Sequence, residues 1–108
     1  MKIYIGGAHQ GQAELAAQEN PEAEIVHDFH IAVREWLEAG KEPSRCVEAL
    51  MATKSDAVIV SNELGSGIVP MAPFDRAWRE AHGRAMCRLS QFSQSVTRVT
   101  CGIGVRIK

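Results

Sequence analysis

The sequence has little of the material that defines several large classes of protein. Its three cysteines form no CxxC pair, which favours free thiols over a disulfide framework or a metal cluster. No apolar run approaches the roughly 20 residues of a membrane-spanning helix, and the start shows no signal-peptide pattern. A net charge of −1 gives no basic surface for nucleic acid or an anionic membrane. These absences predict a cytoplasmic protein without a membrane or nucleic-acid partner.

What the sequence does have is an alternation of strand-like and helix-like segments along its 108 residues. Strands are predicted at residues 2–5, 24–28, 57–60 and 96–101, with a turn and an extension over 102–107. Helices are predicted at residues 12–18, 31–39, from 43 onward and 73–92. In the last helix, apolar side chains at helical spacing are expected in the core: Phe74, Trp78, Ala81, Ala85, Leu89 and Phe92. The alternation predicts one α/β domain, residues 1–108, with a mainly parallel sheet of about four or five strands and helices on both faces.

A polar and glycine-rich segment, Ser61–Pro70, follows the third predicted strand directly. Asn62 and Glu63 offer an amide and a carboxylate, and Gly65 and Gly67 allow the backbone to approach a ligand closely. In an open parallel sheet, ligands bind beyond the carboxyl ends of the strands, which is where this segment is expected. An ordinary strand-to-helix connection is the alternative interpretation of the same residues.

The junction between the first strand and the first helix has the G-x-x-x-x-G spacing of a phosphate-binding loop. Its residues are Gly6, Gly7, Ala8, His9, Gln10, Gly11, Gln12 and Ala13. Backbone N–H groups of such a loop, with a helix N-terminus behind them, bind phosphate oxygens whatever the side chains are. Gln12 and Ala13 stand where such a loop usually has Lys and then Ser or Thr. Gln12 brings no charge, and Ala13 cannot hold Mg²⁺. A plain strand-to-helix turn remains the alternative.

Asp28 follows the second predicted strand. An Asp at the end of such a strand holds the Mg²⁺ shell in phosphate-loop enzymes, so Asp28 is a candidate metal-binding and catalytic residue. The alternative is that Asp28 caps the helix that begins near His30. A metal site on His27, Asp28 and His30 would need a bend, because successive strand residues point to opposite faces.

These motifs, together with Arg79, Gly83, Arg84 and Leu89 on the long helix and the final Gly-Ile-Gly-Val-Arg-Ile-Lys, carry a family resemblance. The chain resembles the adenosylcobinamide kinase/adenosylcobinamide-phosphate guanylyltransferase family over nearly its whole length, and is most similar to its short members. The resemblance implies a phosphate-loop fold that assembles into homo-oligomeric rings, commonly trimers. It also implies phosphorylation of the adenosylcobinamide hydroxyl with GTP or ATP and Mg²⁺, followed by transfer of GMP from GTP.

By this resemblance, Gly6–Ala13 binds the nucleotide, Asp28 takes the Mg²⁺-associated acidic position, and Asn62 and Glu63 line the site, with Glu63 contacting the metal or the hydroxyl. No histidine of the chain matches the one that becomes guanylylated in the family, so the guanylyltransferase half is expected to be absent.

The missing loop lysine leaves two functional classes open. One is a corrinoid-pathway kinase in which Arg34, Arg84 or a neighbouring subunit supplies the charge. The other is a non-catalytic module that senses nucleotide or corrinoid, or serves as a subunit. A purely structural role without a ligand is the remaining alternative.

Overall fold

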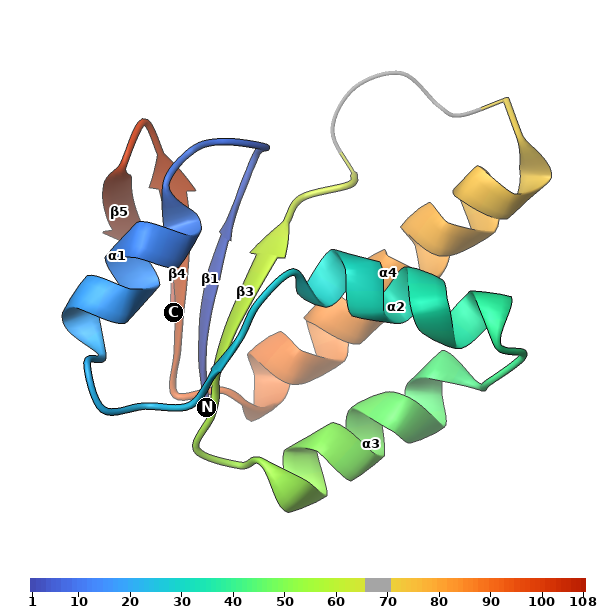
Figure 1. The fold of residues 1–108 in the computed structure, drawn as a ribbon, viewed down its shortest axis with the longest axis horizontal. Coiled ribbons are helices and arrows are strands. Elements are labelled where there is room, and N and C mark those ends of the chain that lie inside the picture. The colour runs from blue at the N-terminus through green and yellow to red at the C-terminus, as the bar shows by residue number, and fades with distance from the viewer. Residues whose placement is uncertain (66–70) are drawn as a thin grey trace.

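The computed structural model describes residues 1–65 and 71–108, and its centre is a five-stranded sheet in the order β2-β3-β1-β4-β5 (Figure 1). The parallel strands are β1 (Lys2–Gly6), β2 (Ile25–Val26), β3 (Val58–Asn62) and β4 (Ser95–Thr100). The last strand, β5 (Ile103–Arg106), pairs antiparallel with β4. The α/β fold with a mainly parallel sheet, expected from the alternation of segments, is confirmed.

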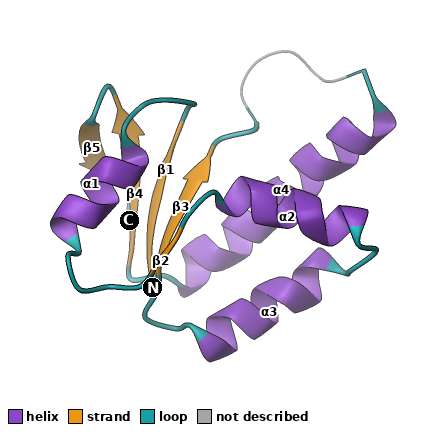
Figure 2. Ribbon diagram, viewed as in Figure 1, coloured by secondary structure: helices purple, strands orange, loops and turns teal. Residues whose placement is uncertain are grey.

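Helices cover both faces of the sheet, so the fold has three layers (Figure 2). One face carries α1 (Gln12–Glu19), which packs with Tyr4, Val58 and Val60 in the smaller core. The other face carries α2 (Phe29–Glu38), α3 (Pro43–Thr53) and α4 (Pro73–Phe92). Their larger core contains five side chains with no exposed surface: Ile3, Phe29, Val33, Ile59 and Leu89.

The central position of β1 decides where the first loop lies. Gly6, the last residue of β1, pairs with Asn62 of β3 on one side and with Val99 of β4 on the other. Because the three strands are parallel, their carboxyl ends meet at one edge of the sheet. The loop after Gly6 therefore lies between the ends of two other strands.

Two expectations about the elements need correction. The second strand is shorter than residues 24–28, because only Ile25–Val26 pairs with β3 and α2 begins soon afterwards. Phe74 and Phe92 are 37% and 42% exposed and do not belong to the core. A helix of 20 residues is about 30 Å long whereas a five-residue strand spans about 17 Å, so the ends of α4 project beyond the sheet.

Proline and glycine mark the helix ends as the sequence suggests. Pro43 and Pro73 occupy the first turns of α3 and α4, and Gly40 follows α2 with a positive φ of 73°. In residues 1–65 and 71–108, no helix combines the length and the apolar character needed to cross a membrane.

Candidate functional site

The loop Gly6–Ala13 joins β1 to α1 at the carboxyl edge of the sheet. His9 and Gly11 have positive φ angles of 60° and 91°. Glycine adopts this left-handed conformation without steric cost. A Cβ atom at Gly6 would lie 2.4 Å from the carbonyl oxygen of Val99, closer than a real Cβ atom can approach. The glycines at both ends of the loop are therefore required by its backbone path.

Gln12 occupies the position of the usual loop lysine, and its side chain is only 5% exposed. Its Nε2 donates to Oδ1 of Asn62 at 2.8 Å and to the carbonyl oxygen of Gly7 at 3.0 Å. The carbonyl oxygens of Gly6 and Ser61 lie 3.3 Å and 3.4 Å from the same nitrogen. Oε1 of Gln12 has no hydrogen-bond partner among the described residues. The amide of Gln12 thus joins the loop to the end of β3.

Gln10 connects the loop by hydrogen bonds to the turn between β4 and β5. Its Oε1 accepts a hydrogen bond from the backbone N–H of Cys101 at 2.7 Å, and its carbonyl oxygen accepts one from Gly102 at 2.7 Å. A Cβ atom at Gly11 would lie 3.2 Å from Cα of Gly102. The hairpin of β4 and β5 therefore supports the loop, which strand and helix patterns alone did not indicate.

Asn62 and Glu63 lie beside the loop at the end of β3. The backbone N–H of Glu63 donates to the carbonyl oxygen of Gly6 at 2.8 Å. Oε2 of Glu63 lies 2.9 Å from Nη2 of Arg98, a residue of β4. The structure thus places an amide, a carboxylate and a guanidinium together at the loop, and the motifs had not singled out Arg98.

The glycine-rich segment after Glu63 is described only in part. Gly65 is exposed, and its carbonyl oxygen accepts a hydrogen bond from the guanidinium of Arg79. No described atom lies within 4 Å of the Cβ position of Gly65. Gly67 belongs to residues 66–70, which lie outside the described residues. Close approach of a ligand at Gly65 and Gly67 therefore stays a prediction.

Asp28 precedes α2, and its backbone rather than its carboxylate begins the helix. Its carbonyl oxygen accepts hydrogen bonds from Ile31 at 2.9 Å and Ala32 at 3.2 Å, while its exposed side chain makes no capping hydrogen bond. The interpretation of the Asp28 side chain as a helix cap is wrong. Because β3 lies between β2 and β1, the two strands are about 10 Å apart across the sheet, and β2 ends level with Ile3 rather than with Gly6. Of the two predicted carboxylates, Asp28 and Glu63, it is therefore Glu63 that lies next to the loop.

The alternative metal site on His27, Asp28 and His30 does not form. Nδ1 of His30 accepts a hydrogen bond from the backbone N–H of Asn62 at 3.1 Å, and the His30 side chain is buried. In the part of the chain that the structure describes, no group of three or more His, Cys, Asp or Glu residues could hold a metal ion.

Two buried histidines support the end of β3. His30 meets Asn62 as described, and Nε2 of His82 lies 2.8 Å from Oγ of Ser61. Because the N–H of Asn62 donates to His30, Nδ1 of that ring carries no proton. The two histidine rings, from α2 and α4, therefore hold Ser61 and Asn62 in place immediately before Glu63.

Burial keeps both rings uncharged. It lowers the pKa of His82 to about 4, and the nearby His30 contributes to the shift. Burial also lowers the pKa of His30, against a smaller opposing effect of Asp28. The sequence held a signal for His82, because it follows Trp78 by four residues and precedes Ala85 by three, which places it on the apolar side of α4.

The two arginines named as substitutes for the loop lysine make their described contacts with residues of α2 and α4. The guanidinium carbon of Arg34 lies 4.9 Å from the ring centre of Phe74 and 4.8 Å from that of Trp78. Nη2 of Arg84 lies 2.6 Å from Oε1 of Glu80 on the exposed surface. Arg98 of β4, by contrast, contacts Glu63 beside the loop, and a cation supplied by Arg34, Arg84 or a neighbouring subunit stays a prediction.

Comparison with known proteins relates the whole arrangement to one family. The model of the cobinamide kinase/cobinamide phosphate guanyltransferase family matches residues 7–107. Two curated relatives, from Salmonella typhimurium strain LT2 and Escherichia coli strain K12, are both named bifunctional adenosylcobalamin biosynthesis protein CobU. They are 39% and 37% identical to the chain over 62 residues, which make up 57% of this chain and 34% of each relative. The matched segment thus spans about a third of the length of these relatives.

The family match extends from Gly7 in the loop to the β4–β5 hairpin, so it includes the site described above except Gly6. The resemblance that the glycine motifs suggested is confirmed. The chain belongs to the cobinamide kinase/cobinamide phosphate guanyltransferase family.

Proposed function

We propose that this chain acts in cobalamin biosynthesis, where it binds a nucleoside triphosphate and phosphorylates the hydroxyl group of adenosylcobinamide. The observation that carries the proposal is the meeting of Gly6–Ala13, Glu63 and Arg98 at one edge of the sheet. The loop between strand and helix supports nucleotide binding. Family membership and the names of the relatives support a corrinoid substrate.

The phosphates of the nucleotide, either GTP or ATP, would lie against the backbone of the loop and the N-terminus of α1. The Gln12 amide is bonded inside the protein and adds no charge. The cation in this proposal is Arg98, whose side chain is 53% exposed and donates one hydrogen bond to Glu63. A guanidinium has five N–H donors, so others remain available to phosphate oxygens. An entering phosphate would compete with Glu63 for Arg98.

In the proposed reaction the substrate hydroxyl attacks the γ-phosphorus of the nucleotide. A bond forms between the hydroxyl oxygen and phosphorus, and the bond from phosphorus to the bridging oxygen breaks, which releases the nucleoside diphosphate. The carboxylate of Glu63 accepts the hydroxyl proton. Arg98 stabilises negative charge on the transferred phosphoryl group.

Mg²⁺ would enter with the nucleotide rather than occupy a site made by the protein alone. Mg²⁺ that enters with a nucleotide is usually held by one or two carboxylates together with the phosphates and waters. Glu63 is the carboxylate beside the loop, Asp28 lies one strand away, and Ala13 has no hydroxyl group. These residues fit a nucleotide-borne ion, which would neutralise phosphate charge.

A non-catalytic subunit that binds nucleotide or corrinoid is the second candidate function. It is favoured by Gln12, whose N–H donors are used inside the protein, and by Ala13 at the position of the metal-binding hydroxyl. In this case the loop would bind phosphates through its backbone, and no phosphorylated corrinoid would form.

Assembly into a homo-oligomer such as a trimer is part of the proposal. β5 is an edge strand, and Ile103, Val105 and Ile107 are 68%, 60% and 62% exposed. An apolar row on an edge strand favours association with another chain.

Calorimetric titration with GTP and ATP, with and without Mg²⁺, tests nucleotide binding. The variants are Gln12→Lys, which restores the usual loop cation, and Gln18→Lys, which adds the same charge on the exposed side of α1 as a control. The same samples are then assayed for phosphorylation of adenosylcobinamide. Binding with turnover supports the kinase, and binding without turnover supports the subunit. No heat from either nucleotide, for the unmodified protein or Gln12→Lys, contradicts both.

A further inference from the structure

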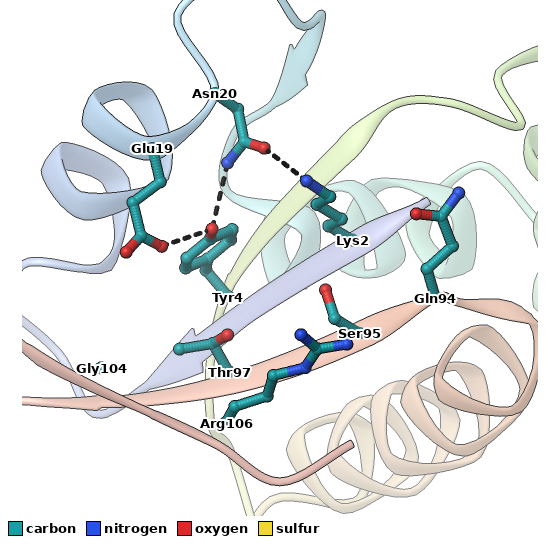
Figure 3. Close-up of a pocket in the computed structure, with 9 residues that line it drawn as sticks. All are labelled: Lys2, Tyr4, Glu19, Asn20, Gln94, Ser95, Thr97, Gly104 and Arg106. Carbon is teal, nitrogen blue, oxygen red and sulfur yellow. Dashed lines mark hydrogen bonds between the residues drawn. The ribbon is translucent and has the colours of Figure 1, made fainter.

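A polar pocket lies on the α1 face of the sheet, near the amino-terminal ends of β1 and β4 (Figure 3). Its volume is about 460 Å³, within the usual range for small-molecule sites. β1 and β4 form its floor, and the end of α1 and β5 form its walls. Lys2 begins β1 whereas the nucleotide loop follows Gly6 at the other end, so this pocket is separate from the proposed nucleotide site.

The pocket exists because α1 is short. Its eight residues span about 12 Å, and they pack against the far half of this sheet face. A Cβ atom at Gly104 would lie 2.7 Å from Cδ2 of Leu15, which shows how closely the helix approaches β5 there. Beyond Glu19 the helix no longer covers the strands, and the uncovered positions include Thr97 and Arg106. The uncovered half of this sheet face carries mostly polar side chains rather than core residues.

A buried hydrogen-bond network builds the wall beside α1. Nδ2 of Asn20 donates to the hydroxyl oxygen of Tyr4 at 3.0 Å, and that hydroxyl donates to Oε1 of Glu19 at 2.7 Å. Tyr4 and Asn20 are 5% and 9% exposed. Burial, together with the hydrogen bond to Glu19, raises the pKa of Tyr4, so its hydroxyl keeps its proton. The wall is therefore ordered before any ligand arrives.

Two cationic side chains, Lys2 and Arg106, line the pocket without a described Asp or Glu partner. Nζ of Lys2 donates to Oδ1 of Asn20 at 3.3 Å, and Nε of Arg106 donates to the main-chain oxygen of Lys108, an oxygen of the terminal carboxylate, at 2.7 Å. Figure 3 shows Arg106 extending from β5 toward Ser95 on β4. Among the described residues, neither Lys2 nor Arg106 forms an ion pair with an Asp or Glu side chain. Lys2 therefore has no charged partner among the described residues, and Arg106 uses one of the five N–H donors of its guanidinium for the terminal carboxylate.

We propose that this pocket binds a small organic anion, whose carboxylate or phosphate oxygens contact Lys2 and Arg106. The planar guanidinium of Arg106 can bind two such oxygens at once, while the ammonium of Lys2 supplies a compact charge. Glu19 and the hydroxyl of Thr97 favour an anion that also carries a hydroxyl or ammonium group. This site is independent of the nucleotide loop and of the reaction proposed there.

The proposal is tested by NMR titration of the ¹⁵N-labelled chain, once with inorganic phosphate and once with acetate. We expect saturable shifts of the amide signals of Lys2, Thr97 and Arg106 with at least one of the two anions. Arg106→Gln is expected to weaken binding about tenfold, because a charge-assisted contact is lost. The control Arg45→Gln removes an exposed arginine from α3 and should leave binding unchanged.

The outcomes separate the alternatives. Phosphate binding alone assigns the pocket to phosphate esters, and binding of acetate extends the assignment to carboxylates. Absence of saturable shifts at these residues with either anion overturns the proposal, as does an Arg106→Gln variant that is folded by circular dichroism and binds equally well. Shifts confined to residues 6–13 also contradict the proposal, while they leave the nucleotide function intact.

Discussion

Nε2 of Gln12 donates a hydrogen bond to Oδ1 of Asn62 at 2.8 Å, across 50 positions of sequence. This bond connects the loop after β1 to the end of β3, the two segments whose motifs suggested a ligand site. It also uses a donor of the residue that replaces the loop lysine. Hydrogen bonds within the protein therefore hold the loop, and the guanidinium of Arg98 on β4 lies beside Glu63 at the end of β3.

Replacing Gln12 with Ala should destabilise the fold. The change removes the donor shared by Oδ1 of Asn62 and the carbonyl oxygen of Gly7, and losing two such partly buried hydrogen bonds costs about 2 kcal/mol. Urea unfolding measures the loss. Gln18→Ala, on the exposed side of the same helix, should change stability by less than about 0.5 kcal/mol. Equal stability of the two variants would show that the Gln12 bonds contribute little.

Arg98→Gln and Glu63→Gln should separate charge stabilisation from proton transfer in the proposed kinase. Loss of the guanidinium should lower kcat about 100-fold, the effect of removing one positioned donor to a transition state. Glu63→Gln should lower kcat while it strengthens nucleotide binding, because it releases Arg98 from its ion pair. Turnover and calorimetric binding are measured on both variants. Wild-type turnover by Arg98→Gln would contradict the role given to this residue.

Stability should fall as the pH drops from about 6.5 to about 4, through His82. Its pKa is about 4 in the folded chain, against about 6.5 when unfolded, so only the unfolded state takes up the proton in this window. The difference corresponds to roughly 3 kcal/mol of stability, present above pH 6.5 and lost toward pH 4. Urea unfolding at a series of pH values measures this dependence. His82→Asn should flatten it, and His9→Asn in the exposed loop should not.

Gly6→Ala and Gly83→Ala should have opposite effects. A Cβ atom at Gly6 meets the carbonyl oxygen of Val99 at 2.4 Å, and such crowding costs about 1–3 kcal/mol. No described atom lies within 4 Å of the Cβ position of Gly83, inside α4, where alanine stabilises a helix by about 1 kcal/mol. Thermal or urea unfolding compares both variants with the unmodified chain. Destabilisation by Gly83→Ala would show that this surface of α4 is covered.

Val105→Lys should dissociate the proposed homo-oligomer. The substitution places a charge in the exposed apolar row of β5, where burial against another chain would remove it from water. Size-exclusion chromatography with light scattering gives the mass of each species. Ile31→Lys, on the surface of α2, serves as the control and should leave the mass unchanged. A monomeric unmodified chain would remove the oligomer from the proposal.

The sequence predicted those features of the fold that depend on residues close together in the chain. Glycines and helix formers indicated the loop and the start of α1, and the apolar run before Ser61 placed Asn62 and Glu63 at the end of a strand. The rule that ligands bind beyond parallel strand ends then associated these segments correctly.

Features that depend on the order of the strands in the sheet could not be predicted from the sequence patterns. Asp28 was predicted as the Mg²⁺-associated carboxylate because it follows a strand, yet β3 lies between that strand and β1 in the sheet, so this role stays a prediction. Arg98 reaches the loop only because β4 lies on the other side of β1. Likewise, His30 and His82 meet β3 through packing of α2 and α4, which helical periodicity does not specify.

The bond between Gln10 and Cys101 spans 91 positions, and this separation bears on how the chain folds. Contacts between distant residues form against a larger loss of chain entropy than local contacts do. The loop Gly6–Ala13 is therefore expected to reach its final geometry late, after β4 and β5 have joined the sheet. A nascent chain that has emerged only as far as α4 would contain both glycine motifs and lack the hairpin that holds the loop in place.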